Sequence, residues 1–198
     1  MAGAHEEHME RVGVGVIGCG IGKWHVEGYR EEPRADIIAL AGLDTPRCNE
    51  VAAEANVPNV YEDYHQLLNR QDIAAVSIAV PNFLHVPIGL DAIAAGKHVL
   101  MEKPLARHEA EAETLVRAAA DAGVVLGIAF NRRARSDMQV LKRHIDGGAL
   151  GRIYHAAGFQ PALRYPLGSA PGSHQRTSAV DPDRSGRPRS GYGSMGHG

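Results

Sequence analysis

The stretch "GVIGCGIGKWH", residues 15–25, places glycine at three alternate positions, Gly18, Gly20 and Gly22. It ends the apolar run of residues 12–17 and leads into a segment that can be helical, which predicts a strand, a tight turn and a helix. Glycines at such a turn let a ligand approach the backbone closely, and the N-terminus of the following helix favours an anion. The turn is therefore a candidate phosphate-binding site.

The spacing of the glycines is G-x-G-x-G, one residue shorter than the usual dinucleotide fingerprint G-x-G-x-x-G. A purely structural turn remains one interpretation. A methyltransferase that binds S-adenosylmethionine is another, but those enzymes usually carry an acid two residues before the first glycine, where this chain has Val16. Dinucleotide binding is favoured by Asp44, which lies at the end of the second expected strand and can accept hydrogen bonds from an adenosine ribose. We expect Thr45 to cap the next helix, which leaves the Asp44 carboxylate for a ligand.

Strands and helices alternate along the chain, and this pattern predicts an α/β fold with a doubly wound parallel sheet over residues 11–130. The expected strands are 12–18, 36–44, 59–61, 73–80, 98–101 and 124–130. The expected helices are 24–32, a helix that opens at Thr45, 63–70, 85–95, 108–122 and 136–146.

Composition narrows the function further. The chain has 198 residues and a formal net charge of -2, which argues against nucleic-acid binding. It has no apolar stretch long enough for a membrane span, and its first residues lack the pattern of a secretory signal. The two cysteines, Cys19 and Cys48, predict no disulfide framework, so we expect a cytoplasmic location. His5 and His8 lack the spacing of a zinc site, and we assign no metal site.

Four further motifs, together with the glycine turn, resemble the Gfo/Idh/MocA family, named for glucose-fructose oxidoreductase and inositol dehydrogenase. They are "VPNFLH" at 80–85, "GKHVLMEKPLA" at 96–106, "AFNRR" at 129–133 and "GALGRIYHA" at 148–156. The element Glu102-Lys103-Pro104 is the most specific of them. The resemblance covers about residues 11–158.

The resemblance implies an NAD-dependent oxidoreductase, with NADP as the other candidate, that transfers a hydride to or from a sugar, inositol or similar polyol. Lys103 would be the catalytic residue, because a lysine amine beside the substrate hydroxyl can accept or relay its proton. Asp44 favours NAD, since a carboxylate repels a ribose 2′-phosphate, although Arg47 lies nearby. The residues implied to bind the cofactor are Gly18, Gly20, Ile21, Gly22, Asp44, Pro81, Asn82, His85, Glu102, Lys103, Asn131 and Arg132.

The resemblance also implies a second, substrate-binding domain, of which residues 131–158 would be the start, with a helix at 136–146 and a strand at 151–158. We expect residues 1–10 to be flexible. Residues 159–198 are rich in Gly, Pro, Ser and Arg, which predicts an irregular or disordered tail and suggests a frameshift or truncation. Members of the family form homo-oligomers through the second domain, so self-association of this chain is doubtful. A catalytically inactive nucleotide-binding remnant is the alternative function.

Overall fold

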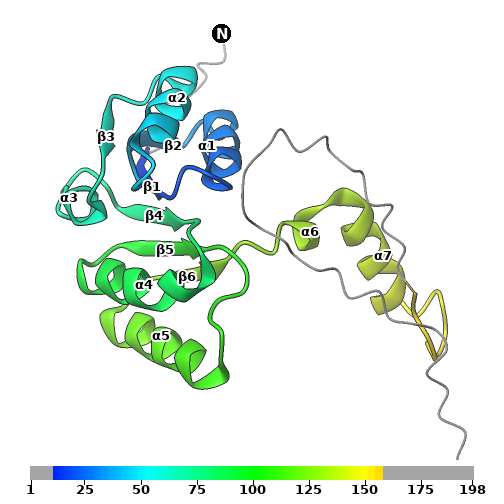
Figure 1. The fold of residues 1–198 in the computed structure, drawn as a ribbon. Coiled ribbons are helices and arrows are strands. Elements are labelled where there is room, and N and C mark those ends of the chain that lie inside the picture. The colour runs from blue at the N-terminus through cyan, green and yellow to red at the C-terminus, as the bar shows by residue number, and fades with distance from the viewer. Residues whose placement is uncertain (1–10, 158–198) are drawn as a thin grey trace, which may run out of the picture. The chain divides into compact units, whose positions relative to one another are not determined.

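The computed structural model describes residues 11–157 (Figure 1). Within this range six strands form a single parallel sheet in the order β3-β2-β1-β4-β5-β6, which confirms the predicted doubly wound α/β fold. The strands are β1 (Val12–Ile17), β2 (Ala35–Ala41), β3 (Asn59–Tyr61), β4 (Ala75–Ile78), β5 (His98–Met101) and β6 (Leu126–Ile128).

Helices connect the strands, and the order of elements along the chain follows the predicted alternation. They are α1 (Gly22–Glu31), α2 (Thr45–Ala55), α3 (Tyr64–Leu68), α4 (His85–Ala94), α5 (Glu109–Ala122), α6 (Asn131–Ala134) and α7 (Ser136–Asp146), with a 3-10 turn, η1 (Asn82–Leu84), before α4. Strand β2 ends at Ala41, three residues earlier than expected, because the chain leaves the sheet at Gly42 to reach α2.

Both faces of the sheet are buried, and neighbouring residues of one strand belong to separate cores. Val16 packs with Val26 of α1 and Val51 of α2, whereas the next residue, Ile17, packs with Ile88 of α4 and Leu115 of α5. Because side chains alternate between the two faces of a strand, α1 and α2 cover one face and α4 and α5 cover the other. The ribbon shows these two helix pairs as separate groups (Figure 1).

Strand β1 pairs with β2 on one side and with β4 on the other, so the direction of chain progression reverses beside β1. In open α/β sheets, ligands bind outside the carboxyl ends of the strands at such a reversal. The glycine turn follows β1 there, the motif of residues 80–82 follows β4, and the element of residues 102–104 follows β5. The topology thus gathers three of the sequence motifs at one edge of the sheet.

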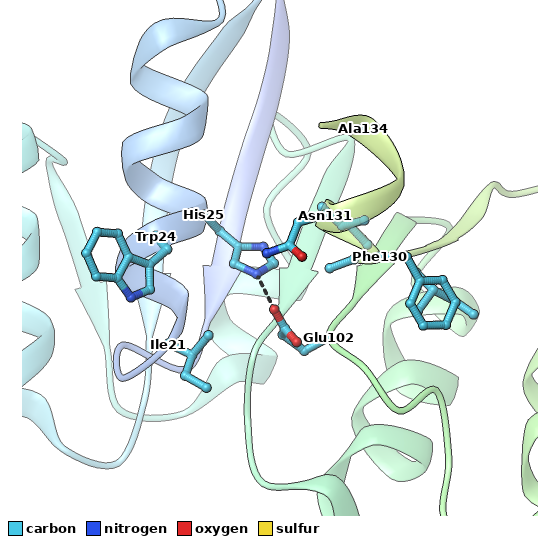
Figure 2. A pocket seen from close by; sticks show the side chains of 10 residues that line it. Ile21, Trp24, His25, Glu102, Phe130, Asn131 and Ala134 are labelled. Carbon is cyan, nitrogen blue, oxygen red and sulfur yellow. Dashed lines mark hydrogen bonds and ion pairs between the residues drawn. The ribbon is translucent and has the colours of Figure 1, made fainter. Parts of the chain in front are cut away.

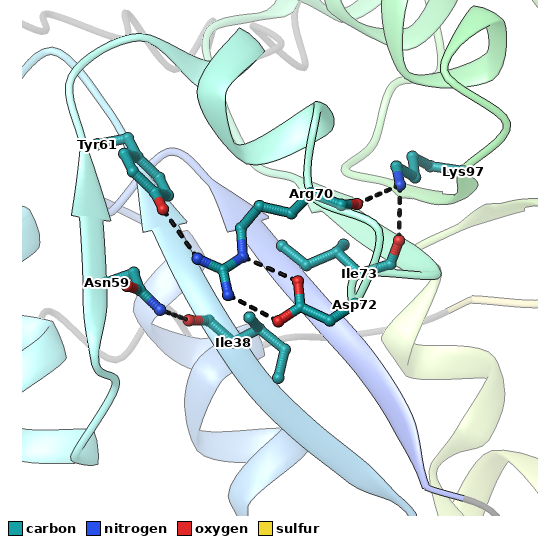
Figure 3. Close-up of polar contacts among 7 residues, drawn as sticks. All are labelled: Ile38, Asn59, Tyr61, Arg70, Asp72, Ile73 and Lys97. Carbon is teal, nitrogen blue, oxygen red and sulfur yellow. Dashed lines mark hydrogen bonds and ion pairs between the residues drawn. The ribbon is translucent and has the colours of Figure 1, made fainter.

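A different cluster stabilises the loops that precede strands β4 and β5 (Figure 3). Lys97 is buried, and its ammonium donates to the carbonyl oxygens of Arg70 and Ile73 at 2.7 and 2.8 Å. Burial lowers the pKa of Lys97. The Arg70 guanidinium pairs with Asp72 at 2.6 Å and donates to the Tyr61 hydroxyl at 3.0 Å. The lysine of the "GKHV" motif is therefore structural.

The last described part of the chain differs from the expectation. Helix α7 occupies the predicted residues 136–146, but residues 151–157 form no strand, so that prediction is wrong for these residues. A strand needs a neighbour to accept its hydrogen bonds, and the described chain offers none there. The predictions for residues 1–10 and for the tail after 157 lie outside the described residues. No helix of residues 11–157 is both long and apolar enough to cross a membrane.

Candidate functional site

Two of the three glycines of the turn are required by contacts within the fold, and the third is not. Gly18 has a φ of +96°, and a Cβ there would lie 2.3 Å from the carbonyl oxygen of Ala79, so only glycine fits. A Cβ at Gly22 would meet Val16 at 3.0 Å, so Gly22 allows α1 to pack closely on β1. At Gly20, by contrast, no described atom beyond its chain neighbours lies within 4 Å of that position. The fold itself does not require glycine at position 20, which leaves open space for a ligand.

The N-terminus of α1 faces this turn. Ile21 occupies the N-cap position, and no described side chain caps the helix there. The first N–H groups of a helix have no partner within it, and together with the helix dipole they attract an anion. The bare Gly20 backbone and the uncapped helix start together fit a pyrophosphate group.

Asp44 caps α2, and the prediction that Thr45 would do so is wrong. The Asp44 Oδ1 atom accepts a hydrogen bond from the backbone N–H of Arg47 at 3.1 Å, and Thr45 is the first residue of the helix. The side chain is exposed, and among the described residues no group pairs with Oδ2. A carboxylate accepts several hydrogen bonds, so capping leaves Asp44 able to accept from a ribose. The Arg47 guanidinium pairs with Glu50 at 2.7 Å.

Cys19 and Cys48 form a disulfide, with their Cα atoms 5.2 Å apart, whereas the sequence analysis expected no disulfide framework from these two cysteines. Both residues are buried in the core beneath α1 and α2. Because they share this core, the turn after β1 lies against the first part of α2. Gly42 leaves room for the bridge, because a Cβ there would lie 2.9 Å from the Cys48 sulfur. The bridge thus joins the glycine turn to the helix that Asp44 caps.

A pocket of about 430 Å³ opens between the start of α1, the ends of β5 and β6, and α6 (Figure 2). Its lining residues are Ile21, Trp24, His25, Leu100, Glu102, Ile128, Ala129, Phe130, Asn131 and Ala134. Of the predicted cofactor residues, it brings together Ile21, Glu102 and Asn131. Trp24 and His25 were missed, although their place in the first turn of the helix after the glycines is a signal that could have found them.

A chain of hydrogen bonds joins α1 to the sheet beneath this pocket. His25 Nδ1 lies 3.1 Å from Ser77 Oγ. His25 Nε2 lies 3.2 Å from Glu102 Oε1 (Figure 2). The Tyr29 hydroxyl lies 2.7 Å from Ser77 Oγ, and burial raises the pKa of Tyr29. On its other side, Glu102 Oε2 accepts from the backbone N–H of Lys103 at 2.9 Å. Glu102 is therefore held by groups of the chain on both of its oxygens.

His85 does not line the cleft, contrary to the sequence prediction. Its side chain is fully buried, with Nδ1 2.7 Å from the carbonyl oxygen of Pro104 and Nε2 3.0 Å from that of Val80. The reason is that His85 is the first residue of α4, a helix that packs against the sheet through buried residues. Its ring links the motif after β4 to the motif after β5 and is not available to a cofactor.

The remaining predicted residues are exposed. Pro81 and Asn82 follow β4, and Arg132 lies in the short helix α6. Lys103 is exposed, it precedes a cis peptide bond to Pro104, and its ammonium has no hydrogen bond or ion pair with any residue of 11–157. Lys103 is thus the charged side chain of the element 102–104 that the residues 11–157 leave without a partner.

Residues 12–130 match the family model GFO_IDH_MocA, described as an oxidoreductase family with an NAD-binding Rossmann fold. Levoglucosan dehydrogenase of Pseudarthrobacter phenanthrenivorans is 36% identical over 154 residues, which are 73% of this chain and 40% of that protein. The chain therefore spans about two fifths of the length of this curated relative, and the same holds for the inositol 2-dehydrogenase of Rubrobacter xylanophilus, of which it covers 42%.

Solved structures resemble the same part of the chain. The scyllo-inositol dehydrogenase of Lactobacillus casei, solved with NAD(H) and scyllo-inositol, is 26% identical, with a TM-score of 0.68 over 72% of this chain and 43% of that one.

Proposed function

Because this chain belongs to the GFO_IDH_MocA oxidoreductase family, we propose that residues 11–130 bind NAD and supply the cofactor half of a sugar or polyol dehydrogenase. The observation that carries the proposal is the shape of the glycine turn. Gly18 and Gly22 are required by contacts within the fold, whereas Gly20 faces open space at the uncapped N-terminus of α1. That arrangement suits a pyrophosphate.

In this proposal the turn and the start of α1 bind the pyrophosphate, and the free Oδ2 of Asp44 accepts from the adenosine ribose. The negative charge of Asp44 favours NAD over NADP, and the pairing of Arg47 with Glu50 holds that guanidinium to another partner. The pocket around Trp24, His25 and Asn131 accommodates the nicotinamide end. NAD, when bound, supplies the hydride acceptor.

Lys103 takes the proton of the substrate hydroxyl in the proposed reaction. Loss of a hydride from the carbinol carbon leaves a carbonyl only if the hydroxyl proton also departs, and a free amine is a suitable acceptor for it. The side chain of Lys103, which has no partner among residues 11–157, fits this role, since the neighbouring Glu102 carboxylate is engaged with His25 and with the backbone.

The alternative is a nucleotide-binding protein without turnover. Turnover separates the two. The 198-residue chain is mixed with NAD and with inositol or sugars, and NADH formation is followed at its absorbance band. Under the dehydrogenase proposal NADH forms, and Lys103→Met removes at least about 99% of the rate while NAD affinity stays within about twofold. NAD binding without any NADH would support the alternative for the 198-residue chain, and a folded chain that binds no NAD would contradict the proposal.

A further inference from the structure

The exposed Lys103 of the proposed site lies between two residues, Glu102 and Pro104, that are each contacted by a histidine, one partly buried and one fully buried. His25 of α1 contacts the Glu102 carboxylate at 3.2 Å, and His85 of α4 contacts the Pro104 carbonyl at 2.7 Å. Each histidine lies at the start of the helix that follows one of the cofactor motifs. The same two helices that follow the cofactor motifs thus also hold the segment that carries Lys103.

The partners of His25 determine which of its nitrogens carries the proton. A carboxylate only accepts, so Nε2 donates to Glu102. In the tautomer with its proton on Nε2, Nδ1 accepts from the Ser77 hydroxyl, and Ser77 Oγ accepts from the Tyr29 hydroxyl. Every hydrogen bond in this series has one donor and one acceptor, and the series ends at the Lys103 N–H, which donates to the second oxygen of Glu102.

The partners of His85 are both carbonyl oxygens, which also only accept. The contact with Pro104 is the shorter, and we assign to Nδ1 the proton that it needs; the contact with Val80 is a hydrogen bond only when Nε2 carries a proton as well. The side chain is fully buried, and no water competes for this donor. Loss of it would leave the Pro104 carbonyl without its partner at the residue after Lys103.

We infer that His25 and His85 are positioning residues, which hold the backbone of Lys103 from its two sides through Glu102 and Pro104. The inference deepens the proposed function, because it rests on that function for the catalytic role of Lys103. The geometry of the element is measurable without cofactor or substrate, so the two can fail separately.

Amide hydrogen exchange of Lys103 in the 198-residue chain tests whether the contact of His25 with Glu102 holds the Lys103 backbone. His25→Asn, whose shorter amide does not reach Glu102, should speed exchange of the Lys103 amide about tenfold. His25→Gln places an N–H donor near the position of Nε2 and should restore slow exchange. His65→Gln, a change at an exposed histidine of α3, is the control. Exchange at Leu40 in β2 reports the fold and should stay constant in all variants.

The contact of His85 with Pro104 is tested separately, through the ¹³C resonance of the Pro104 carbonyl. His85→Asn keeps a donor near Nδ1 and should preserve the resonance, whereas His85→Gln, with its donor near Nε2, should shift it toward the position of a carbonyl without that hydrogen bond.

Three outcomes would overturn the inference: unchanged Lys103 exchange in His25→Asn, faster exchange at Leu40 together with Lys103, or an unchanged Pro104 resonance in His85→Gln. If a variant does not fold, the tautomer of His25 in the unaltered chain decides, since ring ¹⁵N shifts must show the proton on Nε2. Failure of NAD to bind would instead contradict the proposed function and leave these results valid.

Discussion

The burial of apolar side chains differs between two regions of the chain, the sheet region of residues 12–130 and the segment of residues 131–157 that follows it. In the sheet region Leu40, Ile78 and Leu115 are completely buried. In helix α7, Leu141 and Ile145 remain 45% and 38% exposed. The first region completes its own two-sided core, whereas the second presents an apolar helix face that needs another surface to cover it. The comparison teaches that the sheet region completes a hydrophobic core without the segment that follows it.

The largest effect on stability is expected from a substitution in the glycine turn of the sheet region. Gly18→Ala adds a Cβ at a position with φ of +96° that lies 2.3 Å from a carbonyl oxygen. We expect the free energy of unfolding to fall by about 4 kcal/mol through strain and overpacking. Urea denaturation followed by circular dichroism measures the free energy of unfolding. A loss below about 1 kcal/mol would show that the turn does not constrain residue 18 in this way.

Removal of the disulfide has the next largest effect. The bridge closes a loop with a sequence separation of 29, so Cys19→Ala with Cys48→Ala should cost about 3–4 kcal/mol of unfolding free energy. Reductant should destabilise the unaltered chain by a similar amount and leave the double variant unchanged. If reductant changes neither protein, the bridge does not form in solution.

Substitution of two leucines compares the buried core of the sheet region directly with the exposed face of α7. Leu115→Ala, in the buried core, should lower the free energy of unfolding by about 3 kcal/mol, whereas Leu141→Ala in α7 should change it by less than about 0.5 kcal/mol. Denaturant melts of the two variants give the comparison. Equal losses would mean that α7 is packed in the folded chain.

The smallest effect on stability is expected at Gly20. Because no described atom beyond its chain neighbours lies within 4 Å of a Cβ built there, Gly20→Ala should change unfolding by less than about 0.5 kcal/mol. It should nevertheless weaken NAD binding by at least about tenfold, since the methyl group would occupy the proposed pyrophosphate position. Fluorescence of Trp24, the single tryptophan, which lines the pocket, measures the affinity. Unaltered affinity would place the pyrophosphate elsewhere.

The sequence predicted the sheet and most of the helix boundaries because apolar runs, glycines and prolines mark them locally. It also predicted Ile21, Glu102 and Asn131, which the fold brings to one pocket. It missed the features that depend on the packing of distant segments. Cys19 and Cys48 meet only because the turn and α2 share a core.

The two histidines show the same limit. His25 lies 77 positions from Glu102 in the sequence, and nothing local identifies that contact. His85 was predicted from its motif to face the cofactor, but the motif does not reveal that α4 turns its first side chain inward. The prediction that Thr45 caps α2 was wrong because the chain has two capping residues in succession, and only the backbone geometry decides whether Asp44 or Thr45 caps the helix.

Calorimetric titration of NAD into the 198-residue chain, beside Asp44→Ala, tests the central claim most directly. The account predicts one binding site on the unaltered chain, weaker binding of NADP, and a loss of NAD affinity of at least about tenfold in Asp44→Ala, because the ribose loses hydrogen bonds to a charged acceptor. A folded chain that binds no NAD, or that binds it equally well without the Asp44 carboxylate, would contradict it.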